Sequence, residues 1–506
     1  MCTYQFNLGK ILTDLKDPVP LAYKPYGSIN GNVKVAGKLA DPQVKAKVYS
    51  PQLRFDPKYS QLSNINDLYV DASYSKNLID AKTKLVSYDF GRTAVDFTMK
   101  NQDIIAVKAD TDNLKLNSLN QFIPNTVNAN INSGNLDAKV IADFSLKAIK
   151  DKRNLTPERL TKIVNAKGNL DFSGLNLIYK TAKSPFTLTN TSGNFYLDMG
   201  QGDIASRLNL NSNETGVVNA NLDLNDMDAL NAKVSTVNLP LKKIEPFVPN
   251  LYVKSGNISL KSNVVTSLKT LMNKNLSLDQ IIAYLNTDTT LGIKNVNLLY
   301  KTPQRPYSLS NANGDFYLNS NGRDLNSDLQ LVSSEYGNAS AEIFVNDLNA
   351  LNARINVKDI STKTVASFVP KLNATKGLVS VSANVNTSLN QIRFSKLPIT
   401  SLIETKARIN LDNSDFAYTL AKNKFVRSTN TNADMYLSLK NGNVASELSF
   451  GSDQFGTGNL VASLKNFNDT YARLNVNNIP SKTLETFVPN LKVKSGNGDI
   501  KLTVNT

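Results

Sequence analysis

The residue types that most often carry enzyme chemistry are scarce in this chain of 506 residues. It contains no histidine and no tryptophan, and its single cysteine is Cys2. Because histidine is the usual general base and the commonest metal ligand, the composition excludes histidine-based triads and histidine-ligated zinc or iron sites. One cysteine also excludes an internal disulfide and an iron–sulfur cluster. We therefore expect no enzyme, no metal site and no cofactor.

Three short motifs resemble sites for a nucleotide or an ion, but expected strands and turns account better for the residue pattern of each. The segment from Gly31 to Leu39 departs from the spacing of a phosphate loop and alternates like a strand. Gly200-Gln-Gly202 resembles a dinucleotide fingerprint but joins two expected strands, which predicts a hairpin turn. Acidic and amide residues also cluster around Asp226, Asp347 and Asp469. Because these clusters lack the glycine and glutamate of an EF-hand loop, the pattern favours turns over calcium-binding loops.

The chain is built from an internal repeat. The marker Phe-Val-Pro-Asn, or a close variant, begins at Phe122, Phe247, Phe368 and Phe487. A second marker, Asn-Leu-Ile-Tyr-Lys-Thr, starts at Asn176 and recurs, with variation, so that its tyrosine stands at Tyr179, Tyr300 and Tyr418. A third marker follows each of these, with its tyrosine at Tyr196, Tyr317 and Tyr436. Self-similarity at a fixed period is the signature of a repeat architecture.

Glycines after the first marker set the expected boundaries. A lead-in of residues 1–26 precedes a shorter, divergent first repeat at 27–133. Full repeats follow, and residues 496–506 begin a truncated fifth; the full repeats span residues 134–255, 256–376 and 377–495. We read the Phe-Val-Pro-Asn marker, which follows a short helix-like stretch, as a plug where one repeat meets the next.

Within each repeat the hydrophobic residues recur at every second position, which predicts about six strands with one apolar and one polar face. Each full repeat also carries one expected short helix, beginning near Thr156-Pro157, at a capping box from Ser277 to Gln280, and near Pro398. The residues that we expect on the apolar face and as lining of a lipid-binding groove are Val218, Ala220, Leu222, Leu224, Ile258, Leu260, Val379, Val381, Ala383, Val385, Ile409 and Leu411.

One short helix per repeat cannot cover the apolar face of six strands. The sheet must therefore curl onto itself, pair with another chain, or hold something apolar. We expect a mainly β fold: an elongated, curled antiparallel sheet, forming a taco-like β-groove, built from repeats of about 120 residues with one short helix each. A closed β core or a β-solenoid is the structural alternative.

The balance of charge points to an acidic partner. The net charge is +15 and the sequence pI is about 9.4. Lysines are spread along the strands, as in Asn32-Val33-Lys34-Val35, and no dense basic tract is present, so we do not expect nucleic acid as a partner. Anionic lipid headgroups and membrane surfaces fit this distribution better.

The stretch from Gly31 to Val48, in which an alternating run flanked by glycines leads through Asp41-Pro42 into a second alternating run, resembles the β-repeats of the AsmA-like superfamily, of the TamB type. That resemblance implies an elongated β-groove in the envelope of a two-membrane bacterium, anchored in the inner membrane by a helix at the N-terminal end. It also implies a role in moving phospholipid to the outer membrane or in outer-membrane protein assembly. No catalytic residue is carried over.

The leading hypothesis is thus a non-enzymatic bridge that conducts phospholipid through a hydrophobic β-groove between inner and outer membranes and supports outer-membrane biogenesis. Its partners would be phospholipid acyl chains and the two membranes or their docking proteins. Its location would be the periplasm, with an inner-membrane anchor in a missing N-terminal segment. A structural or adhesin-like array with a closed core, an outer-membrane protein assembly factor and an outer-membrane barrel are the alternatives.

Overall fold

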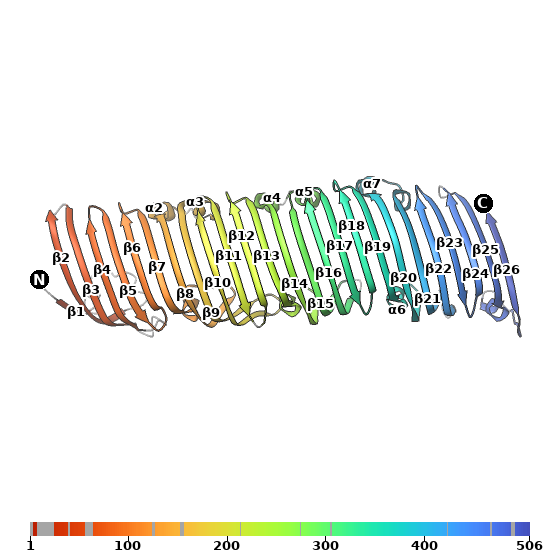
Figure 1. The fold of residues 1–506 in the computed structure, drawn as a ribbon, viewed down its shortest axis with the longest axis horizontal. Coiled ribbons are helices and arrows are strands. Elements are labelled where there is room, and N and C mark those ends of the chain that lie inside the picture. Colours follow the sequence, from red (N-terminus) through yellow and green to blue (C-terminus); the bar gives the residue numbers. More distant parts are fainter. Residues whose placement is uncertain are drawn as a thin grey trace. The chain divides into compact units, whose positions relative to one another are not determined.

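The computed structural model of the chain describes residues 4–7, 25–38, 41–55, 64–123, 127–151, 156–212, 214–273, 275–303, 306–421, 424–465, 468–486 and 491–506. It is mainly β, with 73% of the structure in strands and 12% in helices. The chain divides into two compact units, Met1–Pro249 with Lys261–Lys274, and Asn250–Leu260 with Asn275–Thr506. Each unit is described by itself, and Figure 1 labels their elements.

The first unit is an antiparallel sheet in which each strand pairs with its neighbours in sequence. Its strands are β1 (Tyr4–Asn7), β2 (Pro25–Lys38), β3 (Asp41–Phe55), β4 (Ile65–Ser75), β5 (Leu78–Ser87), β6 (Gly91–Lys100), β7 (Ile104–Lys115), β8 (Ala129–Ser145), β9 (Val164–Lys180), β10 (Pro185–Gly200), β11 (Asp203–Ser212), β12 (Gly216–Asn225) and β13 (Ala229–Pro240).

The second unit follows the same plan, again with antiparallel pairing in chain order. The strand β14 (Leu251–Ser267) is divided between the units. The remaining strands are β15 (Asn286–Lys301), β16 (Pro306–Asn321), β17 (Asp324–Ser333), β18 (Gly337–Asn346), β19 (Ala350–Ser361), β20 (Leu372–Ser388), β21 (Ile403–Ala421), β22 (Lys424–Lys440), β23 (Asn443–Ser452), β24 (Gly456–Lys465), β25 (Asp469–Pro480) and β26 (Asn497–Asn505).

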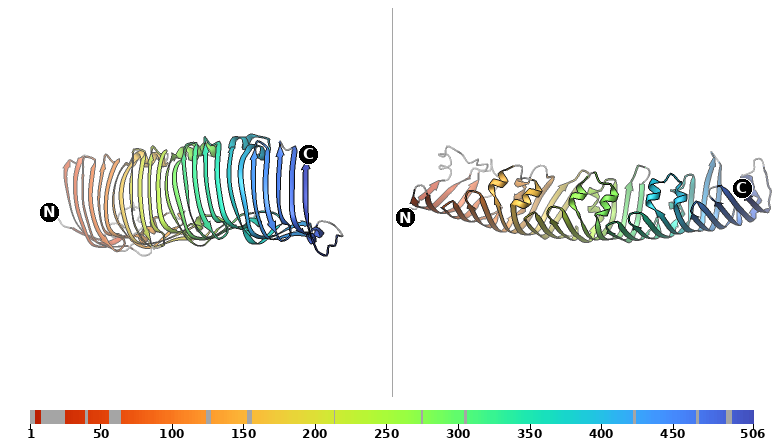
Figure 2. Two further views of the ribbon diagram at one scale, coloured as in Figure 1. Left: turned by 45° about the vertical axis from the view of Figure 1, so that its right-hand side comes forward. Right: turned by 90° about the horizontal axis from the view of Figure 1, so that it is seen from above.

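The helices are short and lie between strands. They are η1 (Leu116–Phe122), α2 (Leu146–Lys150), α3 (Pro157–Ile163), η3 (Leu241–Lys243), η4 (Glu245–Phe247), α4 (Leu268–Met272), α5 (Leu278–Ala283), α6 (Thr362–Ala366), α7 (Leu389–Phe394), α8 (Ile399–Leu402) and η5 (Ser481–Thr486). In Figure 1, α2, α3 and α4 of the first unit and α5 and α7 of the second lie at one edge of their strands, whereas α6 lies at the opposite edge; the view from above shows the helices on one side of the strands (Figure 2).

The sheet is not closed into a barrel, which confirms the expected open antiparallel sheet. Six strands per full repeat are also confirmed, since β8–β13 and β20–β25 each complete one. The first repeat, expected to be short and divergent, has six strands as well, β2–β7. The boundaries expected at Gly134, Gly256 and Gly377 fall inside β8, β14 and β20.

Strand lengths recur with the repeat. In the first unit β8, β9 and β10 have 17, 17 and 16 residues, whereas β11, β12 and β13 have 10, 10 and 12. In the second unit β20, β21 and β22 have 17, 19 and 17 residues, and the next three have 10, 10 and 12. The three long strands of each repeat therefore extend beyond the short ones at one edge of the sheet.

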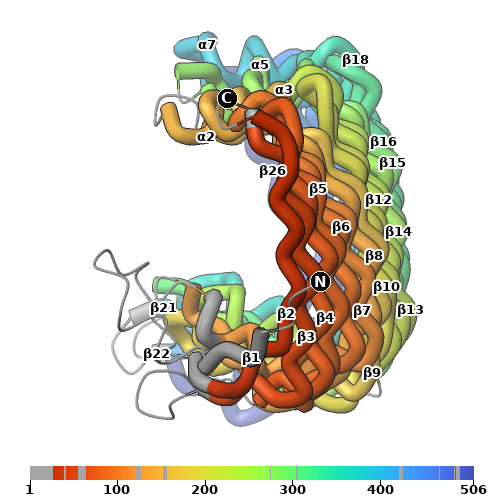
Figure 3. The backbone as a smooth tube through the Cα atoms, turned by 90° about the vertical axis from the view of Figure 1, so that its left-hand side faces the viewer, coloured from red at the N-terminus to blue at the C-terminus, as the bar shows by residue number. Residues whose placement is uncertain are grey.

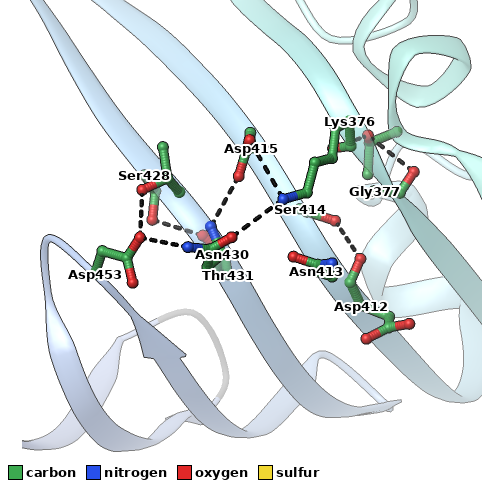
Figure 4. A network of polar contacts seen from close by, with 12 residues as sticks. Lys376, Gly377, Asp412, Asn413, Ser414, Asp415, Ser428, Asn430, Thr431 and Asp453 are labelled. Carbon is green, nitrogen blue, oxygen red and sulfur yellow. Dashed lines mark hydrogen bonds and ion pairs between the residues drawn. The ribbon is translucent and has the colours of Figure 1, made fainter.

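The long strands bend at β-bulges, and a polar network holds each bend. In the fourth repeat Asn430 has φ +50°, and its backbone N–H donates to Oδ1 of Asp415 at 2.8 Å. Its side chain donates to Asp453 at 2.7 Å and accepts from Nζ of Lys376 at 3.1 Å (Figure 4). Asparagine tolerates this left-handed conformation better than most residues. The same backbone contact recurs in the two preceding repeats, between Asn190 and Asn176 and between Asn311 and Asn297.

The expected helices are present, but the expected number of one helix per full repeat is wrong. α3 begins with Pro157 at its first turn, and the capping box of α5 has both reciprocal bonds between Ser277 and Gln280. In each full repeat a further one-turn helix precedes the expected one: α2, α4 and α7. The missed helices follow the serines Ser145, Ser267 and Ser388, whose side chains accept from a backbone N–H of the first turn.

The strand and turn interpretations of the short motifs are confirmed where the structure describes them; residues 466–467, in the cluster around Asp469, lie outside the described residues. Gly31 lies within β2, and the segment from Gly200 to Asp203 is the hairpin turn between β10 and β11. Asp226 has φ +49° in the turn between β12 and β13, and its N–H donates to Asp203 at 2.8 Å. Asp347 makes the same contact with Asp324 at 2.9 Å. The carboxylates of Asp203 and Asp324 stabilise these turns by accepting the backbone hydrogen bonds.

Candidate functional site

The strand register places apolar side chains side by side across the whole first unit. Residues directly opposite each other on neighbouring strands lie on the same face of a sheet. One such row runs from β2 to β13 without a polar residue, and its members in order are Val33, Ala46, Ala72, Ala81, Phe97, Val107, Ala142, Ala166, Met199, Ile204, Leu224 and Leu230.

The second unit has an equivalent row from β15 to β26. It contains one glycine and no polar side chain, and its members in order are Ile293, Gly314, Leu331, Ala339, Val357, Val381, Ile409, Met435, Leu448, Leu460, Leu474 and Leu502. We call the face that carries these rows the apolar face of each unit.

The apolar face is only partly shielded from solvent. Most members of the two rows are half-buried; Leu224 is 6% exposed, whereas Val33 and Leu502 are more than half exposed. Within β12, Val218 and Leu222 are half-buried while Asp223, on the opposite face, is exposed. Side chains converge on the inside of a curved sheet and splay on its outside, so the apolar face is the concave one.

Short helical segments cover the margins of this face. Leu116 of η1 packs against Leu136 and Ala138 of β8, and Phe172 of β9 lies against the same group. In the end-on view α2 and α3 of the first unit stand on the concave side of their strands (Figure 3). The helices are too short to reach along the strands, so the middle of the strands is left without a covering layer among the described residues.

The opposite face is polar and carries the charges. In the first unit Nζ of Lys167 lies 3.1 Å from Asp198, and both Lys167 and Arg207 lie over the ring of Tyr196. Hydrogen bonds from Tyr196 and Lys167 hold the pKa of Asp198 below its ordinary value. In the second unit Arg408 holds the pKa of Asp434 low in the same way. These pairs are exposed cross-strand contacts of a solvated face.

The hollows of the surface lie mainly on this polar face. One of about 660 Å³ is lined by Arg354, Asn384, Glu404 and Lys440, and another, of about 730 Å³, by Lys139, Asp171, Arg207 and other residues. Both are open and carry charges of both signs. Within the described part of the chain no cluster of acidic, histidine or cysteine side chains could hold a metal ion.

The twelve residues expected on the apolar face are all buried or half-buried. Val218, Ala220, Leu222 and Leu224 share one face of β12, and the register sets Val379 opposite Leu411 and Val381 opposite Ile409 on β20 and β21. Ala383 and Val385 continue the face of β20. On β14 Ile258 is 7% exposed, and Leu260 is half-buried.

Sequence reasoning missed two features of the site. The continuity of the rows depends on register, which alternation within a strand does not determine. The expected role of the Phe-Val-Pro-Asn marker as a plug is contradicted, because Phe247 and Phe368 are 53% and 47% exposed and so do not seal the junction between repeats. Its counterpart Phe487 lies outside the described residues, and the side chain of Phe122 is not described either.

Comparisons with known proteins leave the family open. No protein-family model matches the chain, and neither a curated protein nor a solved structure is significantly similar to it. The resemblance of residues 31–48 to AsmA-like repeats therefore stays a prediction. None of the described helices is long and apolar enough to span a membrane.

Proposed function

We propose that this chain is a non-enzymatic lipid-binding protein that holds phospholipid acyl chains on the concave apolar faces of its two units. The observation that carries the proposal is the pair of uninterrupted apolar rows, one in each unit, whose members are mostly half-buried and which lie on a face that the short helices cover only at its margins. Contact with an acyl chain would remove this surface from water, which stabilises by about 0.8 kcal/mol for each buried methylene group.

The uniformity of the rows also supports movement of lipid along the sheet. A chain that shifts from one strand to the next exchanges valine, leucine and alanine contacts for similar ones, so successive positions differ little in free energy. Following the AsmA-like resemblance, we propose that the protein conducts phospholipid between the inner and outer membranes of a two-membrane bacterium. It would act in the periplasm and support outer-membrane biogenesis.

Native mass spectrometry with lipid extraction tests the proposal on the purified chain. We expect several phospholipids per molecule, and we expect the double variant Leu222→Asp/Val381→Asp to lose most of them, because a carboxylate on the apolar face is costly to desolvate against hydrocarbon. Leu222 and Val381 are half-buried members of the apolar face. The β-sheet signal in circular dichroism should be unchanged.

A matched control carries the same substitutions on the opposite face. Val217 is 45% exposed and Val461 is 43% exposed, and each adjoins a residue of the apolar face in its own strand. The variant Val217→Asp/Val461→Asp should retain the lipid of the wild type. A wild-type chain that is stable, monomeric and free of lipid would overturn the proposal and favour a structural repeat array.

A further inference from the structure

The fold brings together two of the sequence markers that define the repeat, and lipid binding by the apolar rows makes no use of either. Tyr179 belongs to the Asn-Leu-Ile-Tyr-Lys-Thr marker, and Phe247 belongs to the Phe-Val-Pro-Asn marker. Their rings stack with centroids 6.5 Å apart, and Phe186 adds a tilted ring with its centroid 5.4 Å from that of Phe247. We call Tyr179, Phe186 and Phe247 the aromatic cluster.

The aromatic cluster lies where the apolar face ends. Tyr179 and Phe186 are opposite each other at the hairpin end of β9 and β10. Two residues further into the same strands, Leu177 lies opposite Leu188, which is 8% exposed. Since α3 precedes the other end of β9, the cluster and the helix pair lie at opposite edges of the sheet. The cluster thus continues the apolar surface to its margin.

The cluster is accessible although its rings contact one another. Phe247 is 53% exposed and Tyr179 is 39% exposed. Exposed aromatic rings that adjoin an apolar surface are typical of the boundary between hydrocarbon and water, where the ring is apolar and the tyrosine hydroxyl is solvated. The position suits the part of a lipid that joins its acyl chains to its headgroup.

Lysines surround the cluster and outnumber the carboxylates there. Lys183 and Lys242 lie 3.7 and 2.8 Å from Glu245, which is on η4 two residues before Phe247. Lys243 pairs with Glu214 at 2.5 Å. Lys180 follows Tyr179 directly and is exposed. Four lysines face two glutamates, so the local field attracts an anion.

The second unit carries aromatic residues at the corresponding positions of the repeat. Tyr300 lies opposite Tyr307 at the hairpin end of β15 and β16, and Tyr300 is 41% exposed. Phe368 lies two residues after the end of α6, whereas Phe247 is the last residue of η4, and Phe368 is 47% exposed. Lys301 follows Tyr300, and its Nζ lies 4.6 Å from the ring centroid of Tyr252. The combination of exposed rings and lysine therefore recurs with the repeat.

We propose that these clusters bind the glycerol backbone and phosphate of phospholipids whose acyl chains lie on the apolar face, one lipid at each cluster. The inference rests on the proposed phospholipid binding and adds where the phosphate-bearing part of the lipid is held: at the exposed rings and lysines on the margin of the apolar face. The rings contact the glycerol region, and the lysines attract the phosphate, which lysine binds as a compact cation.

The experiment compares two fluorescent lipids with identical acyl chains, phosphatidylglycerol and diacylglycerol, in titrations of the full chain. We expect the wild type to prefer phosphatidylglycerol by about fivefold or more, the effect of one lysine near an anionic headgroup. The variant Lys180→Glu/Lys301→Glu should lose this preference and still bind diacylglycerol. The variant Phe247→Ala/Phe368→Ala should weaken the binding of both lipids and keep the preference, because both carry the glycerol region that the rings contact.

The control Lys233→Glu/Lys358→Glu makes the same change of charge at exposed positions of β13 and β19, and it should keep the preference. Glycerophosphate, which has no acyl chains, should not displace either lipid at equal concentration. Equal affinity of the wild type for both lipids, equal loss in the control, or displacement by glycerophosphate would overturn the inference while lipid binding itself stands. Failure of the wild type to bind either lipid would overturn both proposals.

Discussion

At the scale of single residues, the first long strand of each full repeat contains a glycine that no other residue can replace without strain. Gly377 has φ +112°, and a Cβ built there would lie 2.1 Å from Oγ and 2.4 Å from Cα of Ser414. Gly256 has φ +120°, and a Cβ built there would lie 2.6 Å from Cα of Val296. The backbones of neighbouring strands approach so closely here that a side chain has no space.

We predict that Gly377→Ala destabilises the second unit by about 2–4 kcal/mol, because the new methyl group displaces the backbone of β21 and the left-handed φ is strained. The midpoint of urea denaturation measures the effect. Gly451→Ala is the control, since its Cβ would meet no atom closer than 3.6 Å. Similar midpoints for the two variants would show that the bend accommodates a side chain and that the close approach is not required.

At the scale of elements, one device fixes the first helix of each pair to the preceding hairpin turn. Oδ1 of Asp103 accepts from Ser145 Oγ at 2.7 Å and from the N–H of Lys147 at 2.9 Å, at the start of α2. Oδ1 of Asp228 makes the same two contacts with Ser267 and Lys269 at the start of α4. At α7, which lies in the fourth repeat, Oδ1 of Asn349 takes this place and accepts from Ser388 Oγ at 2.7 Å. The cap therefore tolerates either a carboxylate or an amide.

The difference between aspartate and asparagine predicts a dependence on pH. The Ser267 hydroxyl and the Lys269 N–H hold the pKa of Asp228 below its ordinary value, and the Lys147 N–H and Ser145 do the same for Asp103. A depressed pKa contributes stability above the unfolded-state pKa of about 3.9, and this contribution is lost as pH falls through the folded-state pKa.

The variant Asp228→Asn should therefore have the same amide protection of α4 as the wild type at pH 5 and greater protection than the wild type at pH 3. Hydrogen exchange measures this when the two proteins are compared at the same pH. In the reciprocal variant Asn349→Asp, the protection of the α7 amides against hydrogen exchange should decrease when the pH is lowered from 5 to 3. If wild type and Asp228→Asn lose protection of α4 equally on acidification, the carboxylate does not contribute through its charge.

At the scale of the whole molecule, the period-two pattern and the repeat markers were enough to predict an open antiparallel sheet with one apolar face. The pattern could not place Val381 opposite Ile409 or carry one row from Val33 to Leu230, because register arises from pairing between strands. It also could not bring Tyr179 to Phe247, since their contact depends on how η4 returns to the hairpin edge. The hydrophobic pattern within a strand determines which side chains share a face of the sheet, whereas contacts between distant segments determine which residues form a site.

Because each unit has a complete apolar row of its own, we expect lipid capacity to divide between the units. Leu222→Asp should remove part of the bound phospholipid, Val381→Asp another part, and the double variant the sum of the two losses, as sites without shared partners generally behave. Native mass spectrometry of the three variants measures each number directly. Were Leu222→Asp alone to empty the chain, the lipid occupancy of the second unit would depend on that of the first, and the two losses would not be additive.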